Sequence, residues 1–242
     1  MRVTDHTYVL SGTNYSAGEY GPLGNVYGIQ TNEGLILIDC GLPGSGLEII
    51  QETLDYYGIT DPVTHVLVTH AHVDHCGNAK YYQDLGAKII VGAGDVDYLC
   101  KAGGFNMFRD TRVEETTYHL FPAFTPDIAI DHDQEMEIHG LAFQFILIPG
   151  HSMGSMAIQV TFEGKTMLFV GDVIRPAGIF CEDIIPEWRG DPKFDRQMFV
   201  ESMVKLAQLD TDIVLPGHGT LVVRDGTKVL RIAAKKAYTT MR

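Results

Sequence analysis

The chain has 242 residues, of which 45% are hydrophobic and 20% are charged, which is enough apolar material for one sizeable core. Its formal net charge of −13 argues against a nucleic-acid groove, because such a groove needs clustered Lys and Arg side chains. Acidic residues follow Met1 almost at once, and no apolar run reaches the ~18 residues of a membrane span. We therefore expect one cytoplasmic domain over residues 1–242, monomeric or homodimeric, that acts on a small-molecule substrate, with neither nucleic acid nor a membrane as partner.

Alternating strands and helices are expected in the first half of the chain. Short apolar runs bounded by Gly and polar residues predict the strands, and the spacing of Leu47, Ile50 and Leu54 predicts the first helix. A turn at 31–34 makes its flanking strands antiparallel, whereas the β-α-β-α order from residue 64 favours parallel strands covered by helices. The expected elements are strands 6–10, 25–31, 34–39, 64–68 and 88–91, and helices 45–58, 76–84 and 94–102.

The second half is richer in strands. Turn residues such as Gly140, Pro149-Gly150 and Glu163-Gly164 separate its apolar runs. Two halves of this kind form two facing sheets with helices outside, so the predicted fold class is α/β. The expected elements are strands 134–138, 141–148, 155–162, 166–170 and 212–215, and helices 193–208 and 226–238.

Four potential metal ligands fall within six residues, between an apolar β-branched run and a helical pattern. His70 and His72 have the i, i+2 spacing that aims two side chains the same way in extended backbone, so they can grip one ion. Asp74 and His75 lie further round the turn, where they can hold a second ion. The alternative is a polar loop with incidental histidines, but four clustered ligands are far rarer than single ones.

Three further apolar runs end in a potential ligand. Pro-Gly precedes both His151 and His218, and Gly precedes Asp172. Such ligands can converge from distant parts of the sequence, because strand ends share one edge of the core. Asp39 also ends a buried strand, where it either accepts hydrogen bonds from a ligand histidine or backbone amides, or simply forms a turn.

These motifs resemble those of the metallo-β-lactamase superfamily in order and kind. They are Thr-His-Ala-His-Val-Asp-His at 69–75, Pro-Gly-His-Ser at 149–152, Gly-Asp at 171–172 and Pro-Gly-His-Gly at 216–219. The resemblance spans residues 66–219 and implies a four-layer αββα sandwich of two facing mixed β-sheets flanked by helices. It also implies that the first metal is held by His70, His72 and His151, the second by Asp74, His75 and His218, and that Asp172 bridges them.

The bridging position narrows the implied function. The best-known metallo-β-lactamases have Cys where this chain has Asp172, whereas glyoxalase II-like hydrolases, lactonases and several phosphodiesterases have Asp. Glyoxalase II adds a long C-terminal helical domain for glutathione, and only 24 residues (242 − 218) follow His218 here. Quorum-signal lactonases carry a Tyr shortly after the Asp, where this chain has Val173-Ile174-Arg175. The Asp implies a glyoxalase II-like or lactonase-like hydrolase, and the two departures leave the substrate open among esters, lactones and thioesters.

The expected cofactors are two divalent transition-metal ions per chain, zinc by default and iron or manganese as alternatives, because the ligands mix nitrogen and oxygen. Two such ions lower the pKa of a shared water from about 15.7 toward about 7, which supplies hydroxide for attack on a small ester, lactone or thioester. Asp74 is the expected catalytic residue, because its carboxylate can relay a proton to the leaving group. The alternatives are hydrolysis of a phosphodiester or phosphonate, and a metal-binding protein without turnover.

Two aromatic-rich segments flank the predicted ligand-bearing strand ends and are expected to wall an apolar pocket for an uncharged acyl or cyclic substrate. Arg175 holds a substrate carboxylate or phosphate in this interpretation, or pairs with a nearby acid instead. The aromatic side chains have ordinary packing as their alternative role. The expected contact residues are Phe105 and Phe108 in segment 103–130, and Arg175, Phe180 and Trp188 in segment 175–189.

The four cysteines, Cys40, Cys76, Cys100 and Cys181, are scattered without a Cys-x-x-Cys pair. This spacing is typical of reduced thiols and not of a disulfide framework. Cys76 adjoins His75, where it acts either as a ligand or oxidisable thiol, or as a small packed residue at a helix start.

Overall fold

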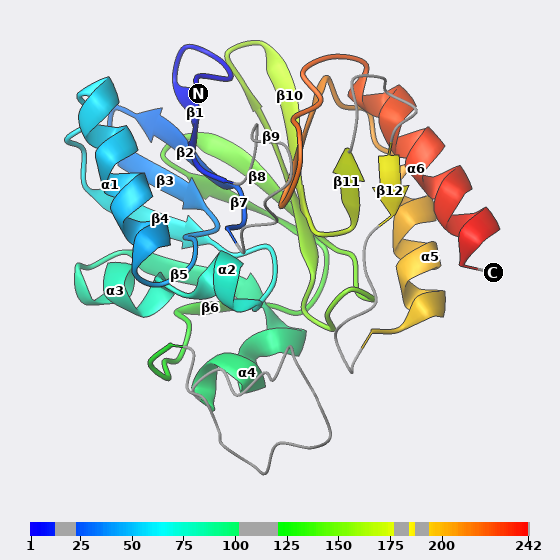
Figure 1. The fold of residues 1–242 in the computed structure, drawn as a ribbon, viewed down its shortest axis with the longest axis horizontal. Coiled ribbons are helices and arrows are strands. Elements are labelled where there is room, and N and C mark those ends of the chain that lie inside the picture. Colours follow the sequence, from blue (N-terminus) through cyan, green and yellow to red (C-terminus); the bar gives the residue numbers. More distant parts are fainter. Residues whose placement is uncertain (13–22, 102–120, 177–183, 187–193, 242) are drawn as a thin grey trace.

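A computed structural model of the chain describes residues 1–12, 23–101, 121–176, 184–186 and 194–241. Within these residues, two mixed sheets face each other and helices cover their outer sides, which confirms the predicted four-layer sandwich (Figure 1). The first sheet has the strand order β1 (Thr7–Ser11), β2 (Val26–Thr31), β3 (Gly34–Ile38), β4 (Val63–Leu67), β5 (Lys88–Gly92) and β6 (Ile128–Ile130). The second has the order β13 (Ile213–Pro216), β10 (Lys165–Gly171), β9 (Met156–Phe162), β8 (Leu141–Leu147) and β7 (Gln134–Ile138).

Strand β3 shows why the first sheet lies in the middle of the molecule. Successive side chains point to opposite faces of a strand, and here both faces are apolar. Ile36 and Ile38 pack toward the second sheet, in a cluster that includes Phe143 and Phe169. Leu35 and Leu37 pack toward the outer helices instead. A continuous apolar run is therefore buried on two sides.

Helices close the sandwich on both outer sides (Figure 1). On the first sheet these are α1 (Ser45–Tyr57), α2 (Val73–Cys76), α3 (Ala79–Asp84) and, after a 3-10 turn at Ala93–Asp95, α4 (Val96–Cys100). On the second sheet they are α5 (Arg196–Leu206) and α6 (Gly226–Thr240). None of the helices in the described residues is long and apolar enough to cross a membrane.

Strand direction determines where the candidate ligands meet. In the first sheet β3, β4, β5 and β6 are parallel, as the β-α-β-α order predicts. In the second sheet β8 and β10 are each antiparallel to β9, and β10 is parallel to β13, so β8, β10 and β13 share one direction. The loops after these strands therefore leave the sheet from one edge, and they carry His151, Asp172 and His218.

The predicted helix 76–84 is confirmed only over α3, from Ala79 to Asp84, because a separate short helix, α2, precedes it. Helix α2 begins at Val73, so Asp74 and His75 lie on a helical turn instead of in a loop. Between α2 and α3, the Asn78 amide Nδ2 donates to the carbonyls of Cys40, Gly41 and Leu42 at 2.8–3.2 Å. Anchoring Asn78 to this distant loop interrupts the helix.

Two other segments also differ from the sequence-based expectation. Segment 103–130 has no clear period, yet its end forms strand β6, which pairs in parallel with β5. In that segment Phe121 and Phe124 are buried in the core beside the first sheet, so they pack and do not wall a pocket. After Asp172, residues Ile174–Pro176 (β11) and Ile184–Pro186 (β12) form a small antiparallel pair that the aromatic content does not predict.

Candidate metal centre

The loop after β4 brings the first two candidate ligands together. His72 is extended, with φ −72° and ψ 149°, and precedes helix α2. His70 Nε2 and His72 Nδ1 lie 3.0 Å apart, and both side chains are buried. The i, i+2 spacing in extended backbone therefore aims the two imidazoles at one point, through different ring nitrogens.

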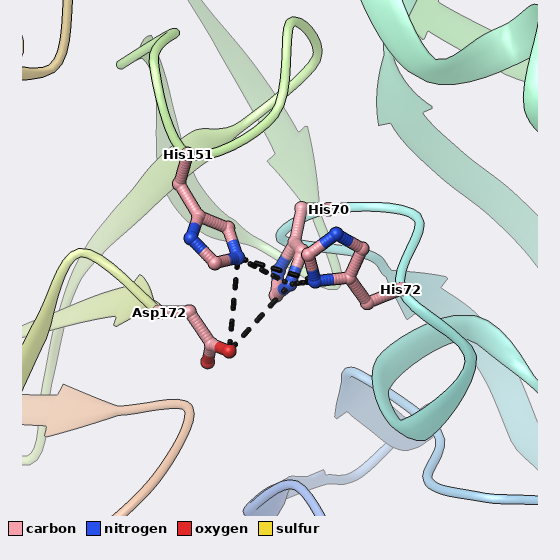
Figure 2. Close-up of side chains that lie close together, drawn as sticks. All are labelled: His70, His72, His151 and Asp172. Carbon is pink, nitrogen blue, oxygen red and sulfur yellow. Dashed lines mark hydrogen bonds and ion pairs between the residues drawn. The ribbon is translucent and has the colours of Figure 1, made fainter. Parts of the chain in front are cut away.

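His151 completes a trio of imidazoles at this point (Figure 2). Its Nε2 lies 3.2 Å from both His70 Nε2 and His72 Nδ1. Each ring nitrogen carries either one proton or one lone pair, so three mutual contacts cannot all be hydrogen bonds. A tetrahedral zinc ion with bonds of about 2.0–2.1 Å places its ligand nitrogens about 3.3 Å apart, close to the observed spacing. The trio therefore fits one metal ion.

Asp172 directly follows β10 and lies between this trio and a second group. Its Oδ2 is 3.7 Å from His151 Nε2 and 3.8 Å from His70 Nε2, and also 3.3 Å from His218 Nε2. Its Oδ1 is 3.3 Å from His75 Nε2. One carboxylate thus faces ligand atoms on both sides.

The second group comes from helix α2 and the loop after β13. Asp74 Oδ2 lies 3.1 Å from His218 Nε2 and 3.5 Å from His75 Nε2. Within the described part of the chain, two sets of residues bring ligand atoms within 4.8 Å of one another. They are His70, His72, His151 and Asp172, here called the first group, and Asp74, His75 and His218, here called the second group.

Asp39 orients a member of the second group through a hydrogen bond to His75. Its Oδ2 accepts a hydrogen bond from His75 Nδ1 at 2.8 Å, which directs the other ring nitrogen toward Asp74 and Asp172. The same carboxylate accepts from Thr69 N at 2.7 Å and from Thr69 Oγ1 at 2.8 Å. Of the two roles considered for Asp39, the structure therefore shows the hydrogen-bonding one.

The loop that carries His218 is held by residues of strand β2 and its start. Asn25 N donates to Gly217 O at 2.6 Å, and Asn25 Nδ2 donates to Pro216 O at 2.9 Å. Tyr27 OH donates to the same Pro216 oxygen at 2.5 Å. A Cβ atom at Gly217 would clash with Asp172 Oδ1, so only glycine allows this approach. This role of Asn25 and Tyr27 is not predicted from the sequence, because both residues act on backbone carbonyls of a loop about 190 residues away and belong to no ligand motif.

The two groups differ electrostatically. Burial lowers the pKa of His70 well below its usual value, and the neighbouring His75 and His72 lower it further. Burial also lowers the pKa of His218, but the Asp172 carboxylate and hydrogen bonds with Asp172 and Asp74 outweigh it and raise this pKa to about 10. In the metal-free chain at neutral pH, the first group therefore presents a neutral imidazole at His70, whereas the second group holds a proton at His218 that a metal ion must displace.

Unsatisfied buried atoms provide a further test of whether the site suits metal ions. His75 Nε2 and Asp172 Oδ1 are 3.3 Å apart, yet neither has a hydrogen-bond partner among the described residues. Buried polar atoms are nearly always satisfied by protein, water or an ion. Imidazole nitrogen and carboxylate oxygen are both ligands of divalent transition metals. The two groups therefore fit divalent metal ions.

Comparison with known proteins agrees with this donor set. The model of the family described as the metallo-beta-lactamase superfamily matches residues 20–218. The chain belongs to this superfamily. The probable metallo-hydrolase YflN of Bacillus subtilis is 26% identical over 236 residues, which cover 88% of this chain and 89% of that protein. Hydroxyacylglutathione hydrolase GloC of Haemophilus influenzae is 28% identical over 183 residues, which cover 74% of this chain and 78% of that protein.

A solved structure confirms the superfamily fold. The native FEZ-1 metallo-beta-lactamase of Legionella gormanii superposes with a TM-score of 0.71 at 20% sequence identity, and the match covers 98% of this chain and 93% of that one. The predicted resemblance and fold class are therefore both confirmed. Membership of the superfamily, together with the two metal-binding groups, makes this chain a metallo-hydrolase.

Of the predicted substrate contacts, the structure describes only Arg175. Arg175 lies in β11, is half-buried and is close to the loop that carries His218, because a Cβ atom at Gly219 would lie 3.1 Å from Arg175 Cγ. Cys76 is buried in the core beside the first sheet and belongs to neither metal-binding group. The other predicted contacts lie outside the described residues: Phe105, Phe108, Phe180 and Trp188.

Proposed function

We propose that this chain is a dinuclear metal-dependent hydrolase that cleaves a small ester, lactone or thioester. The observation that carries the proposal is the position of Asp172, whose two carboxylate oxygens face ligand atoms of both groups at 3.3–3.8 Å. A single carboxylate between two such groups suits a bridge between two ions. We propose zinc as the default metal, with iron or manganese as alternatives, because the ligands mix nitrogen and oxygen.

The two ions, when bound, would supply a Lewis acid for the scissile carbonyl and lower the pKa of water toward about 7. The chain's own residues orient this chemistry. Asp39 fixes the ring of His75 through Nδ1, so that Nε2 is directed at the site. Asp74 Oδ2 faces His218 and His75. The Asp74 side chain is 11% exposed, so it is largely shielded from solvent but still accessible to a substrate. We assign Asp74 to hold a proton and pass it to the leaving group.

Two relatives support hydrolysis, and the name of one of them supports an acyl substrate. The Bacillus subtilis relative is called a probable metallo-hydrolase, and the Haemophilus influenzae relative a hydroxyacylglutathione hydrolase. By resemblance, Asp172 occupies the position at which the best-known metallo-β-lactamases have Cys. An ester, lactone or thioester is therefore the substrate class that we favour over a β-lactam.

The proposed substrate is small and uncharged in its reacting part. Arg175, which lies beside the His218 loop, is assigned to hold a carboxylate or phosphate on the substrate. Phe105, Phe108, Phe180 and Trp188 are assigned to an apolar wall on the strength of their sequence positions. The net charge of −13 would repel polyanions from solution, so nucleic acid is not the proposed partner.

A substrate panel tests this function. Metal-loaded protein is assayed with a p-nitrophenyl ester, a lactone, a thioester and a bis-p-nitrophenyl phosphodiester. We expect turnover of at least one acyl substrate, loss of that turnover with a chelator, and its return on adding metal ions. Preference for the phosphodiester would replace the proposal with phosphodiester hydrolysis, which the same two ions can support. No turnover of any substrate by protein with two bound ions would favour a metal-binding protein without catalysis.

A further inference from the structure

Asp95 contacts both loops that carry the first group, although it belongs to neither metal-binding group. Its Oδ2 accepts hydrogen bonds from Ala71 N at 2.9 Å and from Ser152 Oγ at 2.7 Å. Its Oδ1 accepts from Gly154 N at 2.8 Å. Ala71 lies between two candidate ligands, and Ser152 directly follows a third. A single carboxylate oxygen thus links all three imidazole-bearing positions.

The carboxylate of Asp95 is not used for the ordinary task of an Asp at this place in a fold. Asp95 is the N-cap residue of α4, where Asp commonly accepts a hydrogen bond from the start of its own helix. Here its side chain makes no such bond. The residue is only 3% exposed, and the three donors that it satisfies all come from the ligand loops.

Close backbone packing places Asp95 at this position. A Cβ atom at Gly92, at the end of β5, would clash with the Gly154 carbonyl. A Cβ atom at Gly154 would in turn approach Asp95 N and Cγ within 2.5–2.6 Å. The segment after β5 and the loop after β8 therefore lie in direct contact, which joins the two sheets next to the first group.

We propose that Asp95 is a positioning residue for the first group. By binding Ala71 N and Ser152 Oγ with one oxygen, it keeps His70 and His72 on one side and His151 on the other at the spacing that one ion requires. The second group does not depend on it, because Asp39 holds His75, and Asn25 and Tyr27 hold the His218 loop. This inference rests on the proposed function only in taking both groups to bind metal ions.

The selective loss of one metal affinity tests this inference. The dissociation constant for Zn²⁺ is measured on the full chain by competition with a chromophoric chelator. In a His218→Ala background only the first group is intact. Adding Asp95→Asn is expected to raise the dissociation constant of this group for Zn²⁺ about 10–100-fold, the usual cost of losing a residue that orients a ligand. In a His151→Ala background only the second group is intact, and Asp95→Asn should leave its affinity within about threefold.

Asp127→Asn is the matched control. Asp127 Oδ2 accepts a hydrogen bond at 2.9 Å from Ile89 N of strand β5, which precedes Asp95, so its loss perturbs that strand without removing a bond to a ligand loop. We expect neither affinity to change. If Asp95→Asn does not fold, Ser152→Ala removes one of the three hydrogen bonds that Asp95 accepts. It should raise the dissociation constant of the first group for Zn²⁺ about three- to tenfold, the worth of one hydrogen bond.

Three outcomes separate the possibilities. A lower Zn²⁺ affinity of the first group alone supports the positioning role, even if no substrate is ever hydrolysed. Equal weakening of both ions, or a loss of thermal stability with both affinities unchanged, would overturn it and leave the hydrolase proposal intact. If the unsubstituted chain binds no Zn²⁺ at all, the proposed function and this inference both fall.

Discussion

In Asp172→Ala, we expect the chain to lose stoichiometric binding of both metal ions and, with it, all measurable hydrolysis. The reason is that Asp172 faces His70 and His151 with Oδ2 and His75 with Oδ1, so its removal takes a ligand from each side. It also leaves protonated imidazoles of the second group without their main counter-charge, because this carboxylate is what most raises the pKa of His218 and His75. Metal content by elemental analysis and kcat on the best panel substrate measure the effect.

The control for this variant is Asp133→Ala. Asp133 is an exposed carboxylate that pairs with Lys205 at 2.6 Å, accepts a hydrogen bond from Leu147 N at 2.9 Å and belongs to neither group. Its loss should change neither metal content nor kcat, because exposed ion pairs contribute little. If Asp172→Ala kept two ions per chain and full activity, the bridging position of Asp172 would be excluded.

In Asp74→Asn, metal content should largely survive while kcat falls about 10²–10⁴-fold, the range for losing a proton-transfer group. An asparagine keeps the size of the side chain and one oxygen that can bind an ion, but it cannot take up a proton. Asp74 faces only the second group, with Oδ2 at 3.1 Å from His218 Nε2 and 3.5 Å from His75 Nε2. Its effect on the metal ions should therefore be smaller than that of Asp172→Ala.

The control here is Asp84→Asn, at the end of α3. Asp84 forms an exposed ion pair with Lys80 on the same helix, so neither kcat nor metal content should respond. An Asp74→Asn protein with two ions and undiminished kcat would remove Asp74 from the mechanism. Loss of both ions would instead show that Asp74 is needed mainly for binding.

Much of the fold could be predicted because its signals are local. Apolar alternation and turn residues located β2, β3 and most of the second sheet to within one or two residues. The element order β-α-β-α then predicted parallel strands, and parallel strands place their following loops at one edge. That order accounts for the loop after β4, which carries His70, but His151 and His218 follow strands of the second sheet, so their approach to His70 also depends on how the two sheets face each other.

The details of the site could not be predicted because they depend on tertiary contacts. Nothing in the spacing of the ligands indicates that His72 presents Nδ1 while His70 presents Nε2. The break between α2, which carries Asp74, and α3 lies at Asn78, whose amide donates to a loop 36–38 residues earlier. Asp95 comes shortly after a buried strand, as Asp39 does. This sequence position is the signal from which the role of Asp95 could have been predicted.

Metal stoichiometry tests the central claim most directly. The chain, purified and dialysed against metal-free buffer after loading with Zn²⁺, is analysed for metal per mole of protein together with His70→Ala and His218→Ala. We expect about two ions in the unsubstituted chain, and about one in each variant, because each loses one ligand of a different group. If the unsubstituted chain holds no stoichiometric metal, or if both variants keep two ions and full activity, the two-metal account is wrong.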